Sequence, residues 1–181
     1  MILLGSSKGS YSPKHPMPKK ILFECGRSVE VANFDLTATE IQAFKLAKVA
    51  VDTANLSRPQ IKLEFTTEIF AFSQSPVNNF SITLFFDIVQ VCNGQEEILR
   101  EFKFENRWSI NPGDGQFNRI VIHEPYTITQ CIHPDCSDCC QYYFQVRCIP
   151  ADDLIGAEFV IVNENNLASI SAFAQGLCDG C

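Results

Sequence analysis

A strict alternation of apolar and polar residues constrains the fold of this chain more than any other feature. Residues 60–72 read QIKLEFTTEIFAF, and every second residue from Ile61 to Ile69 is apolar or threonine. A period of two residues is typical of a β-strand that buries one face and exposes the other to solvent. Strands of this kind belong to antiparallel sheets that pack on one side. The predicted inner face comprises Ile61, Leu63, Phe65, Thr67 and Ile69.

A second alternating run is followed by a turn signal. Residues 79–92 read NFSITLFFDIVQVC, and the pair Asn93-Gly94 follows before the β-patterned residues 96–105. An Asn-Gly pair between two such runs is the strongest short signal for a hairpin. We therefore expect two antiparallel neighbours here. The predicted inner face of the first strand comprises Phe80, Ile82, Leu84, Phe86 and Ile88.

The remaining segments also favour strands over helices. Thr37 and Glu40 have the spacing of a capping box and predict a helical turn within residues 36–44. Pro125 is predicted to end one strand and to separate it from the next. We count eight to ten strands and predict an all-β fold, an antiparallel β-sandwich of jelly-roll type. The further predicted strands are residues 20–25, 29–34, 45–53, 117–124, 126–131, 142–148, 157–162 and 167–175.

Three segments make up the predicted domain organisation. Residues 1–20 form a flexible N-terminal arm, since residues 5–20 hold four lysines, three prolines and no acid. Such an arm reaches roughly 60 Å when extended, which is enough to touch a neighbouring subunit. The alternative is a free terminus without a role. Residues 21–176 form the sandwich, and residues 177–181 form a cysteine-bearing tail.

Charge and hydropathy exclude two classes of partner. The net charge is −7, and nucleic-acid binders need clustered Lys and Arg. No apolar run reaches the roughly 18 residues of a membrane span, and the apolar start MILL is too short for a secretory signal. Abundant cysteine normally indicates an oxidising compartment. The sequence offers no readable signal that would direct the chain to such a compartment, so the two indications conflict.

Nine cysteines form the second strong feature, and five of them lie in residues 128–148. Such crowding serves covalent stapling, a structural metal or redox chemistry. The pairs Cys136-x-x-Cys139 and Cys178-x-x-Cys181, with His133 and Cys140 nearby, have the spacing of zinc ligands. Redox Cys-x-x-Cys motifs need a βαβ unit, which this sequence lacks. We expect stapling and no cofactor, and the zinc alternative stays open.

Stapling leaves the pairing undetermined, because eight cysteines alone allow 105 arrangements. An odd number also leaves one thiol over, either for a bond between molecules or as a buried free cysteine. The tail thiols Cys178 and Cys181 are placed to reach another chain. The disulfide candidates are Cys25, Cys92, Cys131, Cys136, Cys139, Cys140, Cys148, Cys178 and Cys181.

Catalytic motifs are not found in the sequence. The chain has no G-x-S-x-G, no H-E-x-x-H and no Gly-rich phosphate loop. His15, His123 and His133 fall in the arm, a strand and the cysteine-rich stretch, and His123 beside Glu124 is read as a solvated pair. We expect a protein that is not an enzyme.

Several segments resemble a cysteine-rich β family of clostridial spore-formers. The chain is similar more loosely to the subunits of endospore appendages, which are disulfide-linked surface fibres with an N-terminal connector. The segments that carry the resemblance are ILFECG (21–26), VAVDTANLSRPQIKLEF (49–65), ITLFFDIVQVCNGQE (82–96), CSDCCQYYFQV (136–146) and ISAFAQG (170–176).

The resemblance implies a structural subunit that polymerises by sheet augmentation and is locked by disulfides between subunits. It implies a spore-surface location, with itself and other spore-coat or exosporium proteins as partners. The arm here holds no cysteine, so Cys25, Cys178 or Cys181 would link the subunits. The alternatives are a zinc-stabilised β domain and a carbohydrate- or matrix-binding module, in which Tyr142, Tyr143 and Trp108 stack on sugars.

Overall fold

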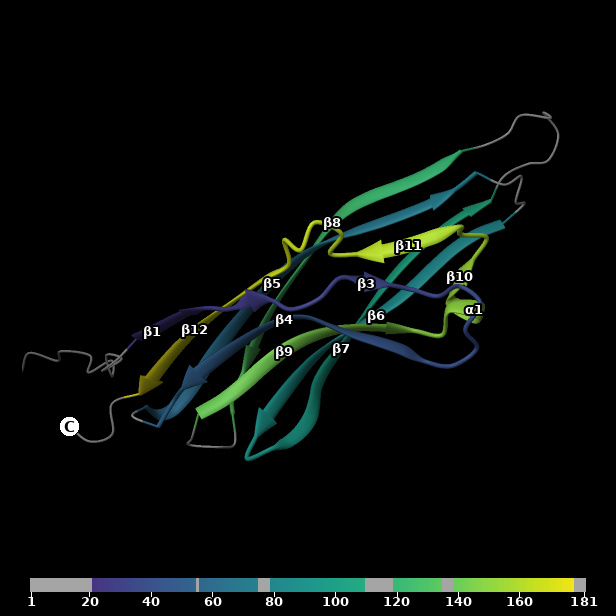
Figure 1. The fold of residues 1–181 in the computed structure, drawn as a ribbon. Coiled ribbons are helices and arrows are strands. Elements are labelled where there is room, and N and C mark those ends of the chain that lie inside the picture. Colours follow the sequence, from purple (N-terminus) through teal and green to yellow (C-terminus); the bar gives the residue numbers. More distant parts are fainter. Residues whose placement is uncertain (1–20, 55, 75–78, 110–118, 135–138, 178–181) are drawn as a thin grey trace, which may run out of the picture.

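The computed structural model describes residues 21–54, 56–74, 79–109, 119–134 and 139–177. These residues form twelve strands and one short helix, all shown in Figure 1. The strands are β1 (Ile21–Cys25), β2 (Arg27–Ser28), β3 (Ala32–Asn33), β4 (Gln42–Asp52), β5 (Ser57–Ser73), β6 (Asn79–Cys92), β7 (Gln95–Ser109), β8 (Ile120–Ile132), β9 (Cys139–Cys148), β10 (Leu154–Ile155), β11 (Phe159–Val162) and β12 (Ser169–Leu177), and the helix is α1 (Pro150–Asp153).

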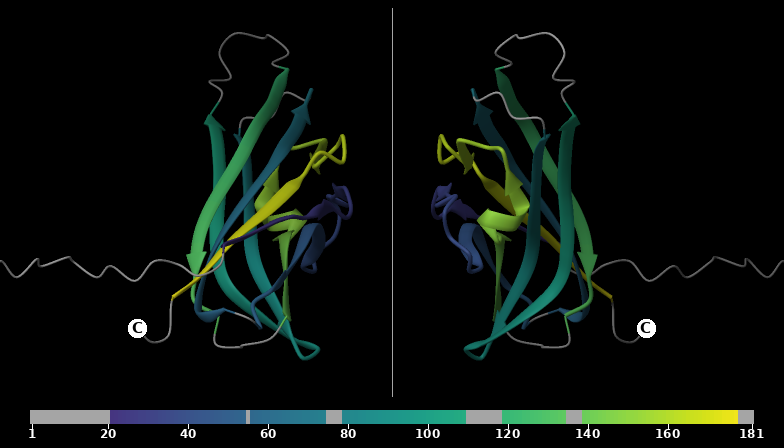
Figure 2. Two further views of the ribbon diagram at one scale, coloured as in Figure 1. Left: turned by 90° about the vertical axis from the view of Figure 1, so that its left-hand side faces the viewer. Right: turned by 90° about the vertical axis from the view of Figure 1, so that its right-hand side faces the viewer.

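Two six-stranded antiparallel sheets make up the fold, which confirms the predicted all-β sandwich. In sheet A, β5 pairs with β8 on one side and with both β12 and β11 on the other. Strand β1 pairs with the far side of β12, and β3 pairs with the far side of β11. In sheet B the order runs from β7 through β6 and β9 to β4 and β2, with β10 also on β6. The long strands run along the length of the molecule (Figures 1 and 2).

The interior is built from the inner faces that the alternation predicts. Both predicted sets, on β5 and on β6, are 2% exposed or less. Phe65 of β5 stacks on Phe144 of β9 with ring centroids 3.8 Å apart, which joins the two sheets. The hairpin between β6 and β7 is also confirmed, since Asn93 and Gly94 both have positive φ, at 52° and 78°. This is the combination that a two-residue type I′ turn requires.

The chain passes from sheet A to sheet B at Gly26, between β1 and β2. The Gly26 amide donates to the Ile170 carbonyl at 2.7 Å. A Cβ at this position would lie 2.2 Å from Cγ2 of Ile170 and 2.3 Å from the carbonyl oxygen of Lys48. Only glycine fits where the chain crosses so close to both sheets.

Pro125 does not end a strand, contrary to the prediction. Strand β8 continues from Ile120 to Ile132, and Pro125 pairs with Glu68 of β5. Among the described strands β8 pairs only with β5, so it is an edge strand. Proline lacks an N–H and is tolerated at an edge, where no second neighbour needs that donor.

The predicted helical turn in residues 36–44 is wrong. Asp35 accepts hydrogen bonds from the backbone N–H and the hydroxyl of Thr37 at 3.0 and 2.7 Å, and Ala38 donates to the Asp35 carbonyl. Strand β4 begins soon after, at Gln42. A carboxylate that closes a turn two residues ahead competes with helix formation. These bonds also hold the pKa of Asp35 below its ordinary value.

The strand count exceeds the predicted eight to ten because β2, β3 and β10 have two residues each. Such short strands carry no alternation that a sequence can show. In the expected strand over residues 29–34, Val29 and Val31 are exposed, and the buried residues are Ala32 and Phe34. The loop expected at Pro150 contains α1. No helix among the described residues is long and apolar enough to cross a membrane.

Candidate functional site

One disulfide joins two neighbouring strands of sheet B. Cys92 ends β6 and Cys140 lies near the start of β9, with Cα atoms 5.1 Å apart. The adjacent pair Val91 and Gln141 fixes the register, which places the two cysteines opposite each other. The side chain of Gln90 donates to both sulfurs, at 2.8 Å to Cys92 and 3.3 Å to Cys140. The bond ties the end of β6, just before the Asn93-Gly94 turn, to the start of β9.

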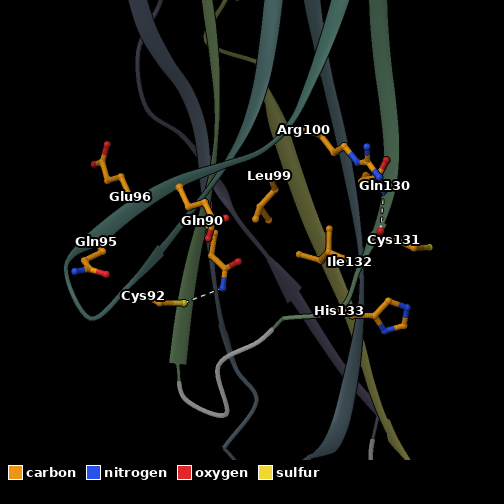
Figure 3. A pocket seen from close by; sticks show the side chains of 11 residues that line it. Gln90, Cys92, Gln95, Glu96, Leu99, Arg100, Gln130, Cys131, Ile132 and His133 are labelled. Carbon is orange, nitrogen blue, oxygen red and sulfur yellow. Dashed lines mark hydrogen bonds between the residues drawn. The ribbon is translucent and has the colours of Figure 1, made fainter.

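A cavity of about 520 Å³ lies beside this disulfide, between β7 and β8 (Figure 3). The two strands meet at one end, where the rings of Phe104 and Tyr126 are 5.6 Å apart. They diverge toward the hairpin, because the pairing of β7 with β6 shifts at Leu99. Such a bulge bends its strand away from a neighbour. The wall of the cavity is mostly polar, and Figure 3 shows Glu96, Arg100, Gln130 and His133 around it.

Two further cysteines are exposed and lie on strands of sheet A. Cys25 is the last residue of β1, and Cys131 is the second-last residue of β8. Both carry free thiols, with no disulfide to any cysteine of the described ranges. Exposed thiols of this kind react with oxidants and with other thiols.

Cys148 differs from them because it is buried at the end of β9. Burial, and then the negative charge of Asp153, raise the pKa of the Cys148 thiol to about 12. A thiol that stays protonated is not nucleophilic. Cys148 therefore acts as a small core side chain, the alternative that the sequence left open for an unpaired cysteine.

The other predicted cysteines are not placed. Cys136, Cys178 and Cys181 lie outside the described residues, as does His15, and the structure describes only the backbone of Cys139. Neither Cys-x-x-Cys pair is therefore tested. Within the described part of the chain, no group of three or more His, Cys, Asp or Glu side chains is arranged to hold a metal ion.

Two of the three aromatic residues expected to stack on sugars are not available on the surface. Tyr142 is fully buried and Tyr143 is 6% exposed. The Tyr143 hydroxyl donates to Glu96 at 2.5 Å, and this bond, followed by the contact with Lys45, holds the pKa of Glu96 below its ordinary value. The side chain of Trp108 lies outside the described atoms.

His123 and Glu124 are both exposed, as predicted, but their side chains do not contact each other. The Nε2 atom of His123 lies 3.5 Å from the carboxylate of Glu68 on β5. Neighbours along one strand point to opposite faces, whereas a cross-strand residue shares the same face. Glu124 instead accepts a hydrogen bond from the side chain of Asn106 at 3.2 Å.

The two exposed thiols lie on two edge strands of sheet A, whose third edge strand is β3. Strand β1 pairs with β12 and β8 pairs with β5, and neither pairs with a second strand in the described part of the chain. One row of paired residues crosses the sheet from Cys25 through Ser171 and Glu64 to Thr129. Cys131 lies two residues from Thr129 and therefore points to the same face as Cys25. This face is the exposed one, as the burial of these residues shows.

Edge strand β1 also exposes large apolar side chains. Phe23 is 63% exposed, Ile21 is 55% exposed, and Phe173 beside Phe23 on β12 is 38% exposed. An apolar strand with an open edge is what monomeric proteins avoid, because it invites pairing with another chain. The alternation did not reveal this surface, since it predicts a buried face for every apolar stripe.

Edge strand β7 of sheet B has the opposite character. It reads QEEILREFKFENRWS and carries charged side chains along its length. Strand β8 has one glutamate and one histidine in IVIHEPYTITQCI, and β1 has one glutamate in ILFEC. Charged side chains on an edge discourage pairing with another sheet. The edges of sheet A lack this protection, and the edge at β7 has it.

Comparison with known proteins places the chain in one family. The model of the family described as Domain of unknown function (DUF4489) matches residues 19–172. A search of curated proteins found no match.

Among solved structures, the chain is similar to one titled Desmodium yellow mottle tymovirus, with 10% identity, a TM-score of 0.30, and 97% of this chain and 99% of that chain covered. It is also similar to a structure of infectious bursal disease virus, Gt strain, with 10% identity, a TM-score of 0.26, and 98% of this chain and 47% of that chain covered. Likenesses this weak carry no argument about the function of the chain.

Proposed function

We propose that this chain, which belongs to the family Domain of unknown function (DUF4489), is a structural subunit that assembles with copies of itself and is not an enzyme. The observation that carries the proposal is a pair of edges of sheet A, strand β1 and the part of β8 that diverges from β7. Each edge ends in an exposed free thiol, at Cys25 on β1 and at Cys131 on β8. Unpaired backbone N–H and C=O groups at such edges accept a strand of another sheet.

The exposed apolar side chains on β1 support the same function. Phe23 and Ile21 lie on the outer face beside the open edge. Burial of such side chains against a neighbouring copy contributes roughly 25 cal/mol for each Å² of apolar surface. The edge therefore supplies hydrogen bonds and the adjacent face supplies hydrophobic burial.

Disulfides between copies would make the assembly resistant to dissociation. A contact between two different surfaces of the subunit grows into a filament when the rotation from copy to copy does not close a ring. Covalent bonds then turn dissociation into a process that requires a reductant. In this proposal the filament is a surface fibre of a spore-forming bacterium, and residues 1–20 connect to a neighbour. The loose resemblance of the chain to the subunits of endospore appendages supports that setting.

Electron microscopy of the purified full-length chain tests the proposal. After oxidation at high protein concentration we expect filaments. We expect Phe23→Lys to prevent them, because a charge on the edge strand discourages pairing. The matched control is Ile98→Lys on β7, a side chain of similar exposure at an edge of sheet B. Monodisperse monomers of the unsubstituted chain, under oxidising and reducing conditions alike, would contradict the proposed function.

A further inference from the structure

We propose that copies join head to tail through sheet A, with β1 of one copy against β8 of the next and a disulfide from Cys25 of the first to Cys131 of the second. This inference rests on the proposed function and names the surfaces and the bond that it uses. Four properties of the fold support it, namely strand direction, face, register and the distance between the two thiols within one copy.

Strand direction favours this pairing. In sheet A, β1 is antiparallel to β12, β12 to β5, and β5 to β8. Three reversals make β8 antiparallel to β1. A second copy in the same orientation, placed beside β1, therefore offers its β8 as an antiparallel partner. The antiparallel order of the sheet continues from one copy into the next without inverting the subunit, and the twist between adjacent strands adds a small rotation at each step.

The face of the sheet is also preserved. Cys25 and Cys131 both lie on the outer face of sheet A, and both are exposed. A neighbour in the same orientation keeps its outer face on the same side. The two sulfurs therefore lie on one side of the new strand pair, as a cross-strand disulfide requires.

Register sets the geometry of the assembly. The row that contains Cys25 ends at Thr129, two residues from Cys131. A purely sideways step would place Cys25 opposite Thr129, with Cys131 as a diagonal neighbour about 7–8 Å away. A slip of two residues, about 7 Å along the strand, brings the two cysteines opposite each other at a distance that a disulfide spans. In this register Glu24 lies opposite Ile132, the last residue of β8, so the two strands overlap only at their ends. A sideways step with a constant slip generates a helical filament.

Within one copy the same bond cannot form. Strands β12 and β5 lie between β1 and β8, so Cys25 and Cys131 are three strand spacings apart. At roughly 4.8 Å for each spacing the separation is about 14 Å, twice the largest Cα distance that a disulfide tolerates. A disulfide between Cys25 and Cys131 in the folded protein therefore joins two copies.

The bond forms by thiol–disulfide exchange with a small disulfide. The thiolate of Cys131 attacks this disulfide, forms a mixed disulfide and releases one small thiolate. The thiolate of Cys25 from the neighbouring copy then attacks the Cys131 sulfur and displaces the second small thiolate. Two protein thiols are oxidised to one disulfide, and one small disulfide is reduced to two thiols. The two protons of the protein thiols are taken up by the released thiolates.

Mass spectrometry of unreduced peptides tests the inference directly. The full-length chain is oxidised with glutathione disulfide, its remaining thiols are alkylated, and it is cleaved after Lys and Arg and before Asp. The sequence then yields peptides 21–27 and 120–134, each with a single cysteine. We expect these two peptides joined in the multimers and absent as a pair from the monomer. Multimers whose peptides 21–27 are joined to each other, or only to those of Cys178 or Cys181, would overturn this inference and leave the proposed function standing.

Mixing variants gives an independent readout. We expect Cys25→Ser and Cys131→Ser to form no covalent multimer alone and to form a dimer, but nothing longer, when mixed. The double variant Cys178→Ser/Cys181→Ser is the control and should still form the full series. A dimer of Cys131→Ser alone would show bonds between two β1 edges, and would overturn the head-to-tail arrangement. Absence of multimers and filaments in every sample, the unsubstituted chain included, would overturn the proposed function as well.

Discussion

The rings of Phe65 and Phe144 stack face to face across the interior, with centroids 3.8 Å apart and planes within 7°. Phe65 lies on β5 of sheet A and Phe144 on β9 of sheet B, and both are fully buried. The pair thus lies where the two layers of the sandwich meet. Because β5 and β9 are central strands of their sheets, the contact joins the middle of sheet A to the middle of sheet B.

Replacing Phe144 by alanine is expected to destabilise the fold strongly. Loss of a buried phenylalanine costs about 3–5 kcal/mol of unfolding free energy, because it removes burial and leaves a cavity. The control is Phe173→Ala, which removes the same ring from the exposed face of β12. Urea unfolding of the reduced monomer measures both. Equal losses in the two variants would contradict the described packing.

Removing the disulfide between Cys92 and Cys140 is expected to lower the free energy of unfolding by about 2–4 kcal/mol, since the bond closes a loop of 48 residues in the unfolded chain. The variant is Cys92→Ala/Cys140→Ala, compared under oxidising conditions. Cys25→Ser/Cys131→Ser is the matched control, because both of these thiols are exposed. If the control loses as much stability of the monomer as the variant, the described pairing is wrong.

A methyl group at position 26 is expected to disrupt the passage between the sheets. Gly26→Ala places a Cβ against the Ile170 side chain and the Lys48 carbonyl, at 2.2 and 2.3 Å. Backbone cannot move aside as a flexible side chain does, so we expect a loss of about 2–3 kcal/mol or more, together with weaker assembly. Gly94→Asn is the control, because its Cβ meets open space and asparagine tolerates the positive φ. Thermal unfolding that ranks the two variants in the reverse order would contradict the model of the crossing.

The buried thiol of Cys148 is expected to react last and to make the fold sensitive to alkaline pH. Its pKa is raised from an ordinary value of 9.0 to about 12, so iodoacetamide at neutral pH should modify Cys25 and Cys131 first. Between these two values the unfolded chain releases the proton while the folded chain retains it. The free energy of unfolding therefore falls as the pH rises from about 9 to about 12.

Comparison with Cys148→Ala isolates the contribution of this thiol from those of other groups. Tyr142, whose pKa burial also raises to about 12, is present in both proteins and cancels in the difference. Denaturant unfolding at several pH values is the measurement. We expect the variant to lose less stability than the unsubstituted chain across the alkaline range. Identical slopes would show that Cys148 is not held protonated by the fold.

The sequence predicted inner faces well and strand neighbours poorly, for a physical reason. Alternation records which side of a strand is buried, so Phe65 and Phe86 were assigned to the core correctly. The neighbour of a strand depends on contacts between residues that are distant in the sequence, and the alternation of apolar and polar residues does not predict these contacts. The pairing of Cys92 with Cys140 follows from β6 lying beside β9, and Pro125 remains in a strand because β8 is at an edge. The exposure of Cys25 and Phe23 has the same origin, since both lie on the outermost strand.

The mass of the assembled protein under denaturing conditions, with and without reductant, tests the central claim most directly. We expect oxidised material to run in a denaturing gel as a series of multiples of 20.3 kDa, or not to enter the gel, and to collapse to a single 20.3 kDa band when reduced. The series depends on disulfides between copies and on nothing else, because the detergent removes every noncovalent contact. A single 20.3 kDa band from oxidised, concentrated protein would contradict the account.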